Sequence, residues 1–379
     1  MRNTLNKILL TSVDKIANLN VNFRFDALHI LRGFAALSVC LFHTFYGNAV
    51  VFSTKGFMWL KFIKDNGGMG VPVFFMISGY CISVSAVKNM QAPKTFLAQR
   101  VKRLYPAYWF SILFGLFLLW GLMSLNLTTT STTPALPAFI KSLSLLVNPP
   151  LTSGFNPSYW TLRHEIYFYL FVFILLYAFR RNLFYALDFI TFSFLLLSNF
   201  SCDIFYLSHI VDKYFIFNSS WMYFYLGILL FRILCYFNKK ELLYHLLLLY
   251  MTFKLYNFDH MVTYIFIGLV IIRPLDRFLK KILVLKPLFF LGTISYSLYL
   301  LHQFITPRMR SILLDRFQGD LPIFIGLVFM LLPISFFIVY IFHVFFEKPF
   351  ADHGINNYYD YKKYCLNFFK TVKDTFVHR

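Results

Sequence analysis

The first long apolar stretch of the chain carries two side chains that can do chemistry, Arg32 near its start and His43 near its end. The two residues are eleven positions apart, so in a helix both side chains lie on one face, about 16 Å apart along the axis. An arginine inside a membrane-length helix costs roughly 2.5–3.5 kcal/mol, so a cavity or a partner is expected to compensate for it. The alternative is that Arg32 reaches the membrane surface and that His43 is an ordinary core histidine.

A second group of ionisable residues begins a later apolar stretch, where Arg163, His164 and Glu165 are consecutive. A glutamate in a spanning helix is expensive unless it is paired or faces water. A carboxylate that orients an imidazole across a helix bundle makes a workable acid–base pair, because it stabilises the imidazole cation. An ion pair between Glu165 and Arg163 or His164 at the membrane interface is the alternative.

Two further groups of polar residues recur at helical spacing. Arg100 and Arg103 are three apart, share a helical face and suit a phosphate-bearing ligand, because arginine binds phosphate oxygens bidentately. The alternative is that they are a basic flank beside the membrane. Ser295, Tyr299 and His302 also share one face, either along a substrate path or as contacts between helices.

The elements that position these groups are apolar helices. The chain is 59% hydrophobic and only 14% charged, and its mean hydropathy is +0.63. A soluble protein of this size does not hide so much apolar surface, so we predict an integral membrane protein. The expected fold is all-α, a polytopic membrane bundle of about ten transmembrane helices, at roughly 26–47, 66–87, from 104, 159–179, 183–201, 214–236, 242–257, 260–272, 287–307 and 321–346.

Charge gives the expected topology. The formal net charge is +20, but the basic residues lie between apolar runs, so they indicate contacts to anionic lipid head groups and not to nucleic acid. An even number of crossings with cytoplasmic Lys and Arg places both termini in the cytoplasm. We therefore expect a cytoplasmic segment at 1–24, a membrane domain at 25–350 and a basic cytoplasmic tail at 351–379. Neither a Gly-rich phosphate loop nor His-Glu-x-x-His occurs, so no metal and no ATP chemistry is predicted.

Six short motifs in this order resemble the acyltransferase-3 family of membrane-bound acyltransferases, over about 25–350. The resemblance rests on the Arg-x10-His pattern of Arg32 and His43 and on the segments Phe74–Tyr80, Arg100–Pro106, Tyr159–Tyr169, Ile294–His302 and Glu347–Pro349. One departure is visible. Many members carry an acidic residue three positions before the arginine, and this chain has His29 there.

The resemblance implies the transfer of an acyl group, most often acetyl, from acyl-CoA to a hydroxyl. The implied acceptor is a cell-envelope carbohydrate such as the O-antigen of lipopolysaccharide, capsule or exopolysaccharide. The implied location is the bacterial inner membrane, in a lipid bilayer that the chain crosses several times. No bound cofactor is expected, because acetyl-CoA is a co-substrate.

On this resemblance we expect His43 and Glu165 to be catalytic. His43 is the general base for the acceptor hydroxyl, tuned by Glu165, or else carries the acyl group transiently. Arg32, Arg100 and Arg103 are expected to bind acyl-CoA. The expected substrate-path residues, with Trp160 stacking on a sugar ring, are Ser78, Trp160, Tyr299 and His302. The competing function is a multi-pass exporter or flippase of an anionic or acylated compound, which would not release free CoA.

Overall fold

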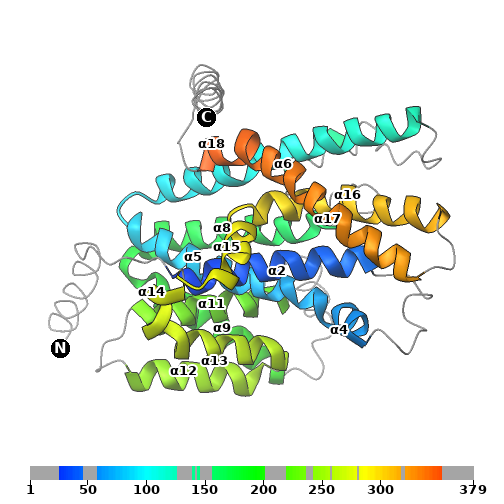
Figure 1. The fold of residues 1–379 in the computed structure, drawn as a ribbon. Coiled ribbons are helices and arrows are strands. Elements are labelled where there is room, and N and C mark those ends of the chain that lie inside the picture. The colour runs from blue at the N-terminus through cyan, green and yellow to red at the C-terminus, as the bar shows by residue number, and fades with distance from the viewer. Residues whose placement is uncertain are drawn as a thin grey trace, which may run out of the picture. The chain divides into compact units, whose positions relative to one another are not determined.

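The computed structural model describes residues 25–45, 58–125, 139–140, 143–145, 156–200, 219–235, 242–256, 258–279, 281–316 and 321–351. Within these ranges all regular structure is helical and no strand occurs, as Figure 1 shows. The prediction of an all-α fold is confirmed. The predicted N-terminal segment 1–24 and the tail from 352 onward lie outside the described residues.

The chain divides into two compact units, each made of segments that are distant in the sequence. The first consists of Met1–Val39, Asn66–Leu97 and Trp160–Thr293, and the second of Cys40–Asp65, Ala98–Tyr159 and Ile294–Arg379. The division passes through helix α2 (Asp26–Phe45). Arg32 therefore belongs to the first unit and His43 to the second.

The first unit holds the start of α2 and most of the middle of the chain. Its other helices are α5 (Gly70–Lys88), α8 (Tyr159–Phe179, all but its first residue), α9 (Leu183–Phe200), α11 (Ser219–Cys235), α12 (Leu242–Leu255), α13 (His260–Ile272), α14 (Asp276–Leu279) and α15 (Lys286–Thr293). Short 3-10 turns are η1 (Gly67–Met69), η3 (Arg180–Asn182), η5 (Arg273–Leu275) and η6 (Leu283–Leu285).

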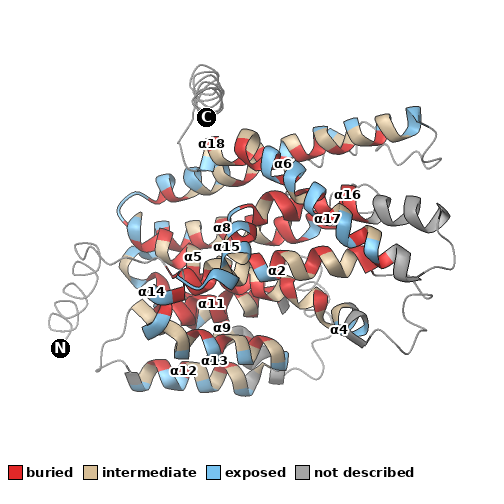
Figure 2. Cartoon of the chain, in the orientation of Figure 1, coloured by how far each residue is buried: buried red, intermediate tan, exposed pale blue. Residues whose placement is uncertain are grey.

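Two glycines bring the backbones of α5 and α11 into direct contact. A Cβ atom added at Gly79 would lie 2.0 Å from the carbonyl oxygen of Phe224, and one at Gly227 would lie 1.9 Å from that of Met76. Small residues permit such an approach between apolar helices. Figure 2 shows both helices largely buried, so this pair forms the centre of the first unit.

The start of α2 is held by a residue that lies about 250 positions later in the sequence, in the same unit. The backbone N–H groups of Asp26 and Ala27 donate to the Asp276 carboxylate at 3.0 and 2.7 Å. Further along, a Cβ atom at Gly33 would lie 2.0 Å from the carbonyl oxygen of Leu288, so α2 packs closely against α15. Both contacts hold the helix on which Arg32 lies.

The second unit holds the end of α2 and most of the last third of the chain. Its helices are α4 (Met58–Asn66), α6 (Pro93–Ser124, from Ala98 on), α16 (Ser295–Arg316), α17 (Leu321–Phe342), the π-helix η7 (His343–Glu347) and α18 (Lys348–Ala351). Aromatic rings join them. The centroids of Phe110 and Phe346 are 4.4 Å apart, and those of Tyr108 and Tyr159 are 4.9 Å apart.

Helix α6 begins earlier than the sequence predicts. Its expected start is 104, after a basic loop, but the helix already begins at Pro93. Proline is well placed in the first turn of a helix, where its missing N–H has no intrahelical partner to lose. Arg100 and Arg103 consequently lie on the helix itself.

Five helical segments among the described residues are long and apolar enough to cross a membrane, or up to six if the bent pair Leu283–Thr293 and Ser295–Thr306 counts as one. The predicted number of about ten is thus not confirmed. The predicted helices 214–236 and 260–272 correspond to α11 and α13, whose apolar lengths are below that of a full crossing.

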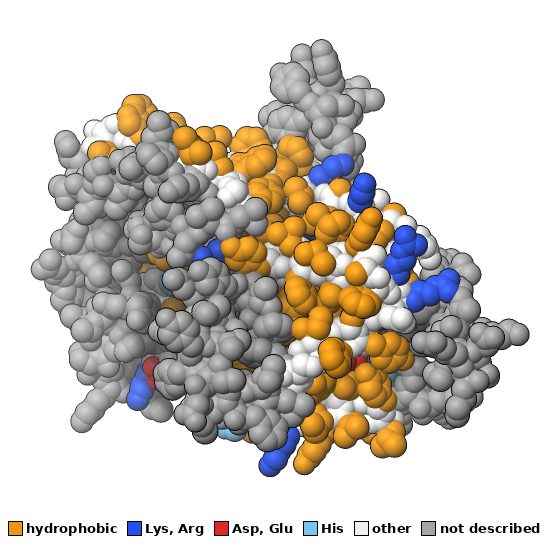
Figure 3. Space-filling model, turned by 180° about the vertical axis from the view of Figure 1, so that it is seen from behind, with side chains coloured by type: hydrophobic (Ala, Val, Ile, Leu, Met, Phe, Trp, Pro, Cys, Tyr) orange, Lys and Arg blue, Asp and Glu red, His pale blue; other side chains and the backbone are white. Residues whose placement is uncertain are grey.

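The exposed surface of both units is strongly apolar. Phe117, Phe189 and Ile271 are 70%, 74% and 71% exposed. Figure 3 shows one face on which most described side chains are hydrophobic, with few Lys and Arg among them. In water such a surface is unfavourable, whereas lipid chains cover it without loss. The helices and the surface together mark a membrane protein.

Candidate active site

Two imidazoles meet in the second unit. His43 lies in the last turn of α2, and His302 lies on α16. Their ring centroids are 5.3 Å apart, with an angle of 39° between the ring planes. His302 is 1% exposed, while His43 is only partly buried. The predicted base is therefore the more accessible member of a histidine pair.

The partners of His302 fix its tautomer. Its Nδ1 atom lies 2.8 Å from the carbonyl oxygen of Tyr299 and 3.2 Å from that of Leu298. Carbonyl oxygens only accept, so we assign the proton of the neutral ring to Nδ1. The Nε2 atom then accepts, and the Ser158 hydroxyl lies 3.3 Å from it. His302 is therefore a buried neutral imidazole, and both of its nitrogens form hydrogen bonds.

Ser158 is itself held on both sides. Its backbone N–H donates to Asn156 Oδ1 at 3.1 Å, and its carbonyl oxygen accepts from the Tyr299 hydroxyl at 3.0 Å. The Asn156 amide in turn donates to the carbonyl oxygen of Leu300 at 3.0 Å. Tyr299 and His302, both predicted on a substrate path, thus belong to one buried network around Ser158.

A buried carboxylate in the same unit caps the start of α16. Glu347, the last residue of η7, accepts hydrogen bonds from the backbone N–H of Ser297 at 3.2 Å and from its hydroxyl at 2.5 Å. His343 lies one turn earlier, with Nδ1 at 2.9 Å from the carboxylate. Arg103 is close enough to act electrostatically on Glu347. An arginine predicted to bind acyl-CoA therefore also compensates a buried acid.

In the first unit, Glu165 has two hydroxyl partners. Ser78 on α5 donates to Glu165 Oε1 at 3.0 Å, and Tyr169, one turn further along α8, donates to the same oxygen. Ser78 is adjacent to Gly79, one of the two glycines at which α5 and α11 approach each other closely. The packing of those two helices therefore sets the position of the hydroxyl that holds Glu165.

The aromatic residues Trp160 and His164 precede Glu165 on α8 and lie one turn apart. Trp160 is 42% exposed, and its carbonyl oxygen is 2.8 Å from His164 Nδ1. The rings of Trp160 and His164 are 5.2 Å apart and nearly perpendicular, and Phe75 of α5 packs against both. The indole is thus fixed at its base while much of its surface stays open.

A family model described as an acyltransferase domain matches residues 25–344, which is well over half of the chain. The chain belongs to the acyltransferase-3 family. A curated relative, "Acyltransferase MdmB" from Streptomyces mycarofaciens, is 30% identical over 148 residues. That match covers 39% of this chain and 38% of the relative, so the chain aligns with well under two thirds of the relative's length. No solved structure matches the chain.

The predicted site residues of this acyltransferase-family chain fall in both units. Arg32, Ser78, Trp160 and Glu165 belong to the first, and His43, Arg100, Arg103, Tyr299 and His302 to the second. Within the units, Ser78 joins Glu165, and His43 joins His302. The roles assigned to these residues stay predictions, as does the division of the chain into 1–24, 25–350 and 351–379. Most of the segment 125–158, which connects α6 to α8, lies outside the described residues.

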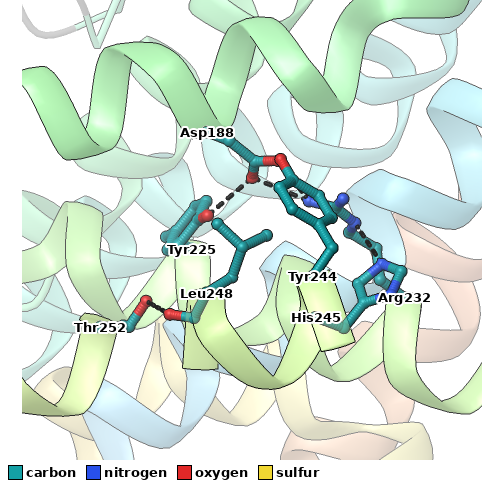
Figure 4. Close-up of polar contacts among 7 residues, drawn as sticks. All are labelled: Asp188, Tyr225, Arg232, Tyr244, His245, Leu248 and Thr252. Atoms are coloured by element: carbon teal, nitrogen blue, oxygen red, sulfur yellow. Dashed lines mark hydrogen bonds and ion pairs between the residues drawn. The ribbon is translucent and has the colours of Figure 1, made fainter. Parts of the chain in front are cut away.

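The family motifs did not predict a buried ionic cluster around Asp188, which Figure 4 shows. Asp188 of α9 accepts from Arg232 Nη1 at 2.8 and 2.7 Å and from the hydroxyls of Tyr225 and Tyr244, both at 2.6 Å. Arg232 Nε donates to His245 Nε2 at 3.2 Å. The signal in the sequence was one charged residue in each of two apolar helices, with opposite signs.

Among the described residues no group of three or more His, Cys, Asp or Glu side chains is arranged to hold a metal ion.

Proposed function

We propose that the chain is a membrane O-acyltransferase that moves an acyl group, with acetyl as the expected group, from acyl-CoA to a hydroxyl of a cell-envelope carbohydrate. Family membership supports acyl transfer. The observation that carries the proposal is the histidine pair, because a partly exposed imidazole packed on a fixed neutral one suits general base catalysis.

In the proposed reaction His43 takes the proton of the acceptor hydroxyl as its oxygen attacks the acyl carbon. The carbon–sulfur bond breaks, and CoA leaves. The variant in which His43 first carries the acyl group itself predicts an acyl-imidazole that can be trapped. Glu165 is the second proposed functional group, with one carboxylate oxygen fixed by Ser78 and Tyr169.

The donor is proposed to bind through arginine. Arg100 and Arg103 share a face of α6, and a guanidinium binds phosphate bidentately, so they suit the phosphates of acyl-CoA. Arg32 is proposed to steer the thioester end. Since acyl-CoA is cytoplasmic, we place the basic segments on the cytoplasmic side of a bacterial inner membrane, with both termini there.

The acceptor is proposed to be a sugar. An indole that is open on much of its surface and fixed by neighbouring rings is a good platform for the apolar face of a pyranose, and Trp160 has both properties. The Thr-rich segment that precedes it carries hydroxyls and no charge between 125 and 139, which suits a neutral carbohydrate.

The test is the release of free thiol from acetyl-CoA by the purified full chain in detergent, with and without an envelope polysaccharide extract. We expect continuous release over many turnovers that depends on the extract and falls by roughly 10²–10⁴-fold in His43→Ala. His260→Ala is the matched control, because it removes an exposed imidazole at the start of α13. A folded protein that releases no thiol from any acyl-CoA would favour the exporter.

A further inference from the structure

Ser158 and His302 have the arrangement of an activated hydroxyl nucleophile. Such a nucleophile needs a base within hydrogen-bond reach and a third group that orients the base. Ser158 Oγ lies 3.3 Å from His302 Nε2, and the carbonyl oxygen of Tyr299 holds Nδ1 at 2.8 Å. With the proton on Nδ1, the lone pair of Nε2 faces the serine hydroxyl, which is the direction needed to remove its proton.

The surroundings of Ser158 favour negative charge on its oxygen. Ser158 directly precedes α8, and the N-terminus of a helix carries a partial positive charge. Its backbone is held from both sides by the Asn156 amide and the Tyr299 hydroxyl, so the direction of Oγ does not depend on the hydroxyl contact alone. His43, the partly exposed neighbour of His302, marks the more open side of the cluster.

We propose that Ser158 receives the acyl group and forms an acyl-serine ester, with His302 as its base; this rests on the proposed function. In the first half-reaction Ser158 Oγ bonds to the thioester carbon and its proton moves to His302 Nε2. The carbon–sulfur bond breaks, and CoA leaves as a thiolate, a good leaving group because thiols are far more acidic than alcohols.

In the second half-reaction the acceptor oxygen attacks the ester carbon. His43 takes the acceptor proton, the bond from carbon to Ser158 Oγ breaks, and His302 returns its proton to Oγ. The products are the acylated acceptor, CoA thiolate and one proton on His43, which passes to water. Between the two half-reactions His302 holds the proton that came from Ser158. In the second half-reaction His302 acts as an acid while His43 acts as a base.

A purely structural role also explains the contact. Ser158 is 4% and His302 1% exposed, so the hydroxyl would only give a hydrogen bond to the lone pair of a buried imidazole. That alternative predicts lower thermal stability on loss of the hydroxyl and no covalent intermediate. Thr306 supplies a matched comparison. It is equally buried on α16, and its hydroxyl donates to the carbonyl oxygen of His302 at 2.9 Å without facing the imidazole nitrogens.

The experiment is to incubate the full chain in detergent with acetyl-CoA and no acceptor, quench with acid, digest, and map the acetyl group by mass spectrometry. If acetyl-CoA gives no thiol, a series of longer acyl-CoA donors replaces it. We expect a burst of thiol equal to the amount of enzyme and an acetyl ester on Ser158. Ser158→Ala should lose the burst and lower turnover by roughly 10²-fold or more, while Thr306→Val keeps both. Ser158→Cys, which retains a nucleophile, should carry the acetyl group as a thioester.

The outcomes separate the inference from the function. Thiol release that requires acceptor, with no acyl-Ser158 and full turnover by Ser158→Ala, overturns the acyl-serine and leaves the acyltransferase intact. An acetyl group mapped to His43 also overturns it and supports the carrier variant. Absence of thiol release with every donor and acceptor overturns the function as well. If Ser158→Ala does not fold, the labelling of the wild type and of Ser158→Cys decides.

Discussion

Removing one charge from the Asp188–Arg232 pair should destabilise the protein more than removing both. Asp188→Leu leaves Arg232, which is 4% exposed, without its carboxylate, and strands two tyrosine hydroxyls that donate to Asp188 at 2.6 Å. Breaking a buried pair by removing one partner costs about 3–5 kcal/mol, because an uncompensated charge remains. Arg232→Met should cost a similar amount, since it leaves the carboxylate with only hydroxyl donors.

The double variant Asp188→Leu with Arg232→Met removes the desolvated charges together. Apolar replacement of a buried pair is often neutral, so we expect the double variant to be less destabilised than either single one. The coupling free energy between the two sites should then be favourable in the wild type by roughly 2–3 kcal/mol. Tyr225→Phe is the graded control. It removes one of the four hydrogen bonds to Asp188 and should cost about 1–3 kcal/mol.

The assay is thermal unfolding in one detergent, followed by intrinsic fluorescence and by size-exclusion recovery after heating. The single variants should lower the midpoint by several degrees more than the double variant. Thiol release per folded molecule should stay close to wild type in all of them, because none of these residues is in the proposed site. Single variants that unfold at the wild-type temperature, or a double variant whose loss is the sum of the two, would refute the buried-charge reasoning.

Three further expectations follow from the same contacts. Gly79→Ala should lower the free energy of unfolding by several kcal/mol and lower activity, because its Cβ meets the Phe224 carbonyl oxygen at 2.0 Å. Gly121→Ala is the control. With no neighbour within 4 Å, it should be neutral or slightly stabilising in a melting scan. Ser78→Ala and Tyr169→Phe should each lower kcat roughly tenfold and have no further effect in a Glu165→Gln background, which a double-mutant cycle would show. Ser297→Ala should lower the unfolding temperature, because it removes a donor to buried Glu347. A variant that unfolds at the wild-type temperature but has a lower kcat would contradict that structural role.

Helical periodicity predicted which residues share a face, but not which helices meet. Ser295, Tyr299 and His302 share a predicted helical face, and Tyr299 and His302 lie in one hydrogen-bonded network. That their neighbours are Ser158 and His43 depends on packing between segments far apart in the chain, which no local pattern encodes. The predicted helix 287–307 is interrupted, since α15 ends at Thr293 and α16 begins at Ser295.

Apolar content predicted a helical membrane protein. It also led to the prediction that a basic segment would be a loop, although part of that segment is helical. The basic segment 88–103 is predicted to be a loop, whereas Lys88 ends α5 and α6 already begins at Pro93. The Asp188–Arg232 pair was missed for the related reason that each charge alone looks unfavourable in an apolar helix. Only the meeting of α9 and α11 makes the two compatible.

Two buried carboxylates, Asp276 and Glu347, accept backbone N–H groups at the start of a helix. The first N–H groups of a helix have no partner within it, and in an apolar medium each unsatisfied group is costly. Asp276 accepts from the N-terminus of α2, and Glu347 accepts from that of α16. These are the two helices that carry His43 and His302. A negative charge at a helix N-terminus is favourable, so each acid fixes the start of a helix whose later turn presents an imidazole.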